Sequence, residues 1–105
     1  MNSPYRIVFV FYLLVSTLLS QSINGFVREE STGEPISYAN VFLSNTALGA
    51  ATSRDGYFVI TDVPKGEYEF NVTMIGYSIY KEKISVSDTA SIRLEIRLKE
   101  EVIET

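Results

Sequence analysis

The 105-residue chain is predicted to fold as an all-β sandwich of six or seven short strands. Three turn signals rich in glycine and proline, at residues 32–35, 54–56 and 63–66, separate its apolar segments. Turns about ten residues apart are typical of small sandwiches. Within the segments, apolar residues recur at every second position, which is the period of a half-buried strand, whereas a helix would repeat them every three or four residues.

The turns are attributed to residues with special backbone properties. Glycine adopts positive φ without steric cost, and proline fixes φ and lacks an N–H, so strands are expected to stop at both. Asp55 is expected to hydrogen-bond its own turn; calcium ligation by Asp55 and Asp62 is the alternative, but this loop offers few oxygen ligands. The expected turn formers are Gly33, Pro35, Asp55, Gly56, Pro64, Gly66 and Gly76.

The N-terminal half predicts four strands, at residues 23–29, 40–44, 50–53 and 57–61. Phe26 lies on the opposite side of the first strand from Ile23, Gly25 and Val27, and Phe42 is expected to face outward or toward an edge. The third and fourth strands flank Asp55 and Gly56, and Asp-Gly suits turns with positive φ, so a β-hairpin is expected there. Val41 and Leu43 are the expected core residues of the second strand, and Phe58 shares one face of the fourth strand with Ile60.

The C-terminal half predicts three further strands, at residues 67–74, 78–86 and 91–99. The first of these alternates most clearly. Its expected inward residues are Tyr68, Phe70, Val72 and Met74, and its expected outward residues are Glu67, Glu69, Asn71 and Thr73. In the last strand, Ile92, Leu94, Ile96 and Leu98 alternate with Arg93, Glu95 and Arg97.

Residues 1–22 are predicted to be a secretory signal peptide. Arg6 precedes an apolar run at residues 7–19, and Ser20 and Ser22 provide small residues for cleavage after position 22. A membrane anchor or a buried core helix is the alternative. The run is shorter than the roughly 20 residues that a spanning helix needs, so export is expected.

Composition argues against most catalytic functions. The chain contains no histidine and no cysteine, so it lacks the commonest general base, the thiol nucleophile and the commonest zinc ligands. Its net charge is −4, and it becomes −5 when residues 1–22, which carry Arg6 and no acid, are removed. Such an acidic, mixed surface does not favour nucleic acid. We therefore expect no enzyme, no metal and no cofactor.

Three tyrosines are candidates for a surface cluster. Tyr38, Tyr77 and Tyr80 lack a structural role in the predicted strands and could stack on a glycan. The sequence Asn71-Val72-Thr73 matches a glycosylation sequon, but it falls within a predicted strand and such matches are frequent by chance.

Five fragments, in this order, resemble the carboxypeptidase regulatory-like domain. They are INGFV at 23–27, TGEPI at 32–36 leading to ANV at 39–41, TSRDGYF at 52–58, VPKGEY at 63–68 and IGY at 75–77. The resemblance implies a transthyretin-like (prealbumin-like), seven-stranded antiparallel Greek-key β-sandwich without catalytic residues. We assign this domain to residues 23–99.

The variant with Ile-Gly-Tyr resembles the domain that follows the signal peptide of TonB-dependent outer-membrane receptors. Residues 100–105 resemble the TonB-box or plug-leader segment of those receptors, except that Glu104 departs from its apolar pattern. The resemblance implies a non-enzymatic periplasmic accessory domain at the outer membrane, as a fragment or truncated product of a nutrient importer. Its partner would be TonB or the rest of the receptor. The expected TonB contacts are Glu101, Val102, Ile103, Glu104 and Thr105.

The alternative is a stand-alone exported module. It would bind a glycan or a protein through the tyrosines or through an exposed strand edge.

Overall fold

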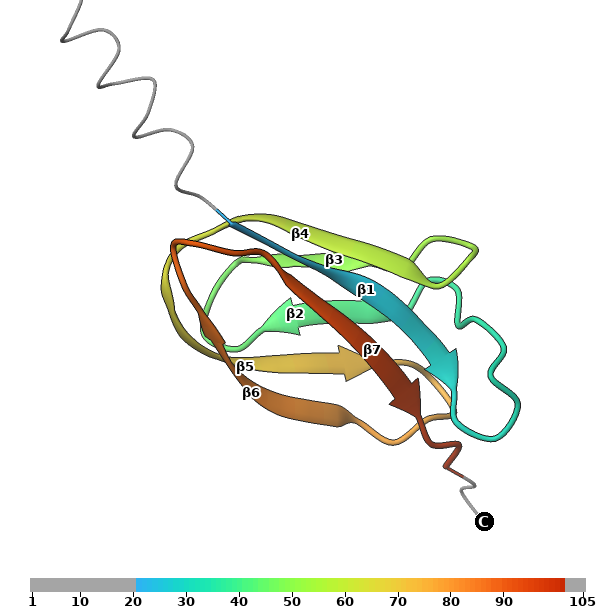
Figure 1. Cartoon of the computed structure of the whole chain (residues 1–105). Coiled ribbons are helices and arrows are strands. Elements are labelled where there is room, and N and C mark those ends of the chain that lie inside the picture. The colour runs from blue at the N-terminus through green and yellow to red at the C-terminus, as the bar shows by residue number, and fades with distance from the viewer. Residues whose placement is uncertain (1–20, 102–105) are drawn as a thin grey trace, which may run out of the picture.

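A computed structural model describes residues 21–101, which form two packed β-sheets and no helix (Figure 1). This confirms the predicted all-β sandwich of seven strands. The strands are β1 (Gln21–Glu29), β2 (Asn40–Leu43), β3 (Gly49–Ala51), β4 (Tyr57–Val63), β5 (Gly66–Thr73), β6 (Tyr80–Val86) and β7 (Ile92–Leu98). The predicted signal peptide lies outside the described residues, except for Gln21 and Ser22, which begin β1.

One sheet has the strand order β4-β1-β7 and the other β3-β2-β5-β6. The pairing is antiparallel except between β1 and β7, which run parallel. This corrects the expectation of a wholly antiparallel sandwich. The β6–β7 connection returns the chain to the end of the sandwich where β1 begins, so both strands run in the same direction (Figure 1). Alternation of apolar residues carries no information about strand direction.

The core lies between the two sheets. Its centre includes Phe58 of β4 and Phe70 of β5, whose ring centroids lie 5.6 Å apart. The expected inward faces of the strands are confirmed, although Tyr68, Met74, Ile92 and Leu94 are only partly buried at the margin. The buried apolar residues are Ile23, Val27, Ile36, Ala39, Val41, Leu43, Phe58, Ile60, Val63, Phe70, Val72, Val86, Ile96 and Leu98.

The hairpin expected at Asp55 and Gly56 is wrong, because β3 and β4 belong to different sheets. Gly56 does adopt a positive φ of 78°, and its N–H donates to the Ser53 carbonyl at 2.9 Å. The turn therefore exists, but it carries the chain from one sheet to the other. Thr52, which precedes this turn, is buried and hydrogen-bonded to the β1–β2 connection.

The Thr52→Val variant is expected to lose about 2 kcal/mol of stability. The Thr52 hydroxyl accepts the Ala39 N–H at 2.8 Å and donates to the Ile36 carbonyl at 2.7 Å, and valine would leave both buried groups unpaired. Urea unfolding followed by circular dichroism measures the loss. Thr61→Val, on an exposed position of β4, is the matched control and should change stability little. Equal stability of both variants would contradict the buried role of the Thr52 hydroxyl.

Two features of the strands differ from simple alternation. Asn71 lies on the outward side of β5, opposite Phe42, as expected, but it is buried there, and its amide donates to Ser44 Oγ at 2.8 Å and to the Glu69 carbonyl at 3.1 Å. These partners satisfy the amide and allow its burial. Asp62 has a φ of 57° where the β1–β4 register shifts, and this bulge returns Val63 to the core. The fourth strand therefore extends beyond its predicted end at residue 61.

The described chain enters and leaves the sandwich at opposite ends. β1 begins at one end, and the chain passes beyond β7 at the other, where the β1–β2 and β5–β6 connections also lie (Figure 1). This second end, which we call the C-terminal end, holds most of the residues singled out from the sequence.

Candidate functional site

The described start of the tail pairs with the segment around Gly76. The Ser78 N–H donates to the Lys99 carbonyl at 2.8 Å, and the Glu101 N–H donates to the Gly76 carbonyl at 2.9 Å. Tyr77 and Glu100 form an antiparallel bridge between these bonds. The chain thus leaves the sandwich in an extended form. The other expected TonB contacts, Val102, Ile103, Glu104 and Thr105, lie outside the described residues.

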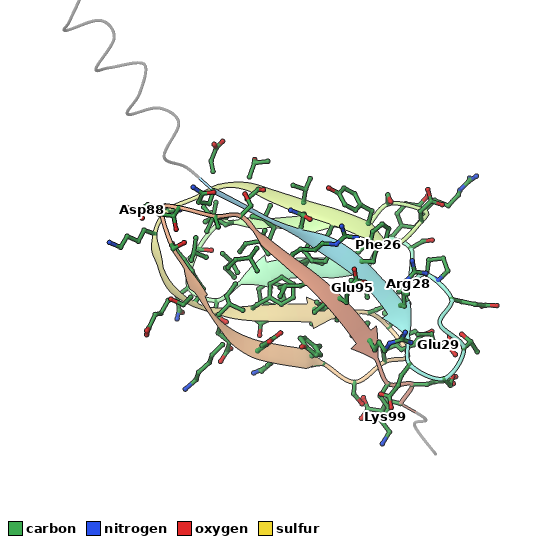
Figure 2. The ribbon with its side chains drawn as sticks, in the orientation of Figure 1. Phe26, Arg28, Glu29, Asp88, Glu95 and Lys99 are labelled. Carbon is green, nitrogen blue, oxygen red and sulfur yellow. The ribbon has the colours of Figure 1, made fainter. Side chains whose placement is uncertain are left out.

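The Ile-Gly-Tyr motif shapes the segment that receives the tail. Gly76 has a φ of 90°, which favours glycine, and the Tyr77 N–H donates to the Met74 carbonyl at 3.1 Å. The Tyr77 hydroxyl donates to Glu29 Oε2 at 2.8 Å and thereby connects the β5–β6 loop to the end of β1. This hydrogen bond to Glu29, together with burial and nearby carboxylates, raises the pKa of Tyr77. Figure 2 shows Glu29 and Lys99 at this end of the molecule.

A shallow apolar depression of about 530 Å³ lies beside the tail. Its exposed large apolar side chains are Ile75, Tyr38 and Ile79, with 95%, 69% and 62% of their surface accessible. Large apolar side chains this exposed, and gathered in one place, are typical of contact surfaces. The depression, which we call the end patch, is lined by Tyr38, Asn40, Thr73, Met74, Ile75, Tyr77 and Ile79.

The structure brings together two of the three candidate tyrosines. Tyr38 and Tyr77 line the end patch, whereas Tyr80 does not. The Tyr80 hydroxyl donates to Glu82 Oε2 at 2.7 Å, and burial and this bond raise the pKa of Tyr80 to about 12. Sequence reasoning missed Ile75 and Ile79. An isoleucine next to Gly76, where a turn normally carries polar residues, was the available signal.

The lining of the end patch is mainly apolar. Within residues 21–101, no three potential metal-ligating side chains gather into a group. Glu29 is engaged by both Ser31 and Tyr77, so its carboxylate has a structural role. In the same described part of the chain, no helix is long and apolar enough to cross a membrane.

The two packed sheets define a seven-stranded β-sandwich. The sequence profile of the CarboxypepD_reg-like domain matches residues 23–105. The chain belongs to the CarboxypepD_reg-like domain family, which confirms the resemblance found in the sequence. No curated protein matches the chain.

Solved structures share the sandwich. A type II cohesin–X-dockerin complex from Acetivibrio cellulolyticus contains a chain with 28% identity and a TM-score of 0.62; the match covers 74% of this chain and 56% of that one. The pilus 2b backbone protein of group B streptococcus has 17% identity and a TM-score of 0.62, with 77% and 41% covered. The major pilin subunit BcpA of Bacillus cereus has 13% identity and a TM-score of 0.62, with 75% and 30% covered. The chain thus spans little more than half, or less, of these proteins.

Proposed function

We propose that this chain is a non-enzymatic domain, exported to the periplasm, that serves as the N-terminal accessory domain of a TonB-dependent outer-membrane receptor for nutrient import. The observation that carries the proposal is the pairing of Glu100 and Glu101 with residues 76–78 beside the end patch. Membership of the CarboxypepD_reg-like family and the signal sequence predicted at residues 1–22 also support it.

The path of the chain suits a domain that connects to one neighbouring segment at each end of the sandwich. β1 and β7 run parallel, so the chain enters at one end of the sandwich and leaves at the other. Glu100 and Glu101, the described part of the tail, pair with residues 76–78 as a strand does, and strand-addition partners recognise an extended backbone of this kind. We propose that TonB binds residues 101–105 in this way and that the end patch contacts the partner or the rest of the receptor.

Binding of the purified C-terminal periplasmic domain of TonB to the exported chain tests this function. Isothermal titration calorimetry would compare the unmodified chain with Val102→Pro and Ile103→Pro, which remove consecutive N–H groups and so cover both strand registers. At least one proline variant is expected to bind about tenfold more weakly, the effect of losing a ladder hydrogen bond.

Val102→Thr and Ile103→Thr are the matched controls, because they keep the N–H and the β-branched shape. They should bind almost as well as the unmodified chain. The proposal would be overturned if TonB failed to bind the unmodified chain, or if proline and threonine variants bound equally.

A stand-alone exported module is the second candidate. The exposure of Tyr38 next to Tyr77 in the end patch favours it, because aromatic faces can stack on a neutral glycan or anchor a protein. Neutral-glycan binding that is lost in Tyr38→Ala, together with absent TonB binding, would select this function.

A further inference from the structure

The outer face of the three-stranded sheet carries aromatic and arginine side chains that no role described above uses. Phe26 of β1 pairs with Tyr57 of β4, and Arg28 of β1 pairs with Arg97 of β7. Figure 2 shows Phe26, Arg28 and Glu95 along β1 and β7. We define the arginine face as Phe26, Arg28, Tyr57, Arg93, Glu95 and Arg97.

The two aromatic rings of the arginine face lie next to the Arg28 guanidinium, which is already held in position. The rings of Phe26 and Tyr57 lie 5.3 Å apart, and Tyr57 keeps 40% of its surface exposed. The Arg28 guanidinium lies 5.2 Å from the Phe26 ring centroid, and its Nη1 donates to the Gly33 carbonyl at 3.3 Å. Because Arg28 is held on two sides, it would lose less side-chain entropy when a ligand binds.

The charges on the arginine face are unbalanced. Arg28 and Arg97 are direct cross-strand neighbours, and like charges in such positions destabilise a sheet. Arg93 contacts Glu95 at 3.5 Å, but both side chains are exposed, so this ion pair contributes little. Among residues 21–101, the Arg97 side chain has no ion pair or hydrogen bond. The face therefore carries a net charge of +2 on a chain whose total is −4.

We propose that the arginine face binds an acidic glycan, with a uronate carboxylate held between Arg28 and Arg97 and a neighbouring sugar ring stacked on Tyr57. The planar guanidinium matches the two oxygens of a carboxylate, and an anion there would relieve the repulsion between the two arginines. Tyr57 lies opposite Phe26, diagonally from Arg28 and two strands away from Arg97, so the ring contact and the carboxylate contact come from different sugar units along the glycan. The arginine face shares no residue with the tail or the end patch, so a negative result for glycan binding would leave the TonB proposal unaffected.

Titration of the exported chain with polygalacturonate tests the proposal. Calorimetry at about 50 mM and about 150 mM salt would also be run with methyl-esterified polygalacturonate, which keeps the sugar but lacks the charge, and with inorganic polyphosphate, which keeps the charge but lacks the ring. Polygalacturonate is expected to bind most tightly of the three polymers, and more weakly at the higher salt concentration.

Two variants and one control locate the site. Arg97→Ala should weaken polygalacturonate binding about tenfold, and Tyr57→Ala about fivefold. Arg54→Ala removes the same charge from an exposed turn outside the arginine face and should leave binding within about twofold. Circular dichroism would verify the fold of each variant.

Three results would overturn the proposal. The first is no binding of polygalacturonate by the unmodified chain. The second is an equal loss in Arg54→Ala and Arg97→Ala, which would show attraction by overall charge alone. The third is equally tight binding of polyphosphate without an effect of Tyr57→Ala, which would show a general anion surface.

Discussion

The Gly25→Ala variant is expected to lose about 3 kcal/mol of stability or more, and at this cost a marginal domain unfolds. A Cβ atom at position 25 would overlap the carbonyl oxygen of Leu94, which is backbone and has no rotamer to escape into. Gly25 and Leu94 are register partners where β1 and β7 run parallel, so relief would require separating these two strands. Urea unfolding followed by circular dichroism measures the effect.

Gly33→Ala separates this overlap from the general cost of replacing a glycine. Gly33 has a φ of 77° and no atom within 4 Å of the position of an added Cβ, so alanine there meets backbone strain alone. That strain costs about 1–2 kcal/mol. If Gly25→Ala were no more destabilising than Gly33→Ala, the close approach of β1 and β7 would be refuted.

The Phe70→Ala variant is expected to lose about 3–5 kcal/mol. Phe70 is completely buried at the middle of β5 and its ring contacts Phe58 of the opposite sheet. Removing the ring leaves a cavity between the sheets, which a core bounded by strand backbones fills poorly. The same unfolding measurement applies, with the midpoint shifted to lower urea at an unchanged slope.

Phe42→Ala is the control for Phe70→Ala. Phe42 lies on the neighbouring strand β2, is only partly buried and has outward parity. Its truncation removes the same side chain from the other face of the sheet and should cost less than about 2 kcal/mol. Losses of similar size in the two variants would contradict the assignment of the inner and outer faces.

The two proposed surfaces can be tested independently. The end patch lies at the C-terminal end with the tail, whereas the arginine face lies on the outer side of β4, β1 and β7. We therefore expect Arg97→Ala to leave TonB binding unchanged and Ile103→Pro to leave polygalacturonate binding unchanged. Such a result would describe a domain that binds a glycan and a protein at separate places.

Much of the fold was predictable because a strand with one buried face carries an apolar residue at every second position. The alternation of Phe70 and Val72 in β5, and of Ile96 and Leu98 in β7, identified strands and core together. The burial of Asn71 on the outward side of β5 was not predicted, because it depends on Ser44, a residue far away in sequence that accepts its hydrogen bond. Alternation distinguishes the two sides of a strand but not what covers them.

The candidate site was predictable only in part. The tyrosine-rich loops and the tail were recognised from the sequence, yet the joining of Tyr38 and Tyr77 with Ile75 and Ile79 required the packing of two connections at one end. The pairing of Arg28 with Arg97 could not be predicted from the sequence either, because these residues are neighbours only through the parallel register of β1 and β7.

The sequence by itself determined the family, the all-β class, the positions of the strands and their inward faces, because these depend on local turn chemistry and period-two burial. The tertiary structure decided which strands became neighbours. It assigned β3 and β4 to different sheets, where Asp55 and Gly56 had indicated a hairpin, and it set β1 parallel to β7. Which strands pair depends on how the two sheets pack over a shared core. The contacts that decide this join residues far apart in sequence, so no short stretch of the chain reveals them.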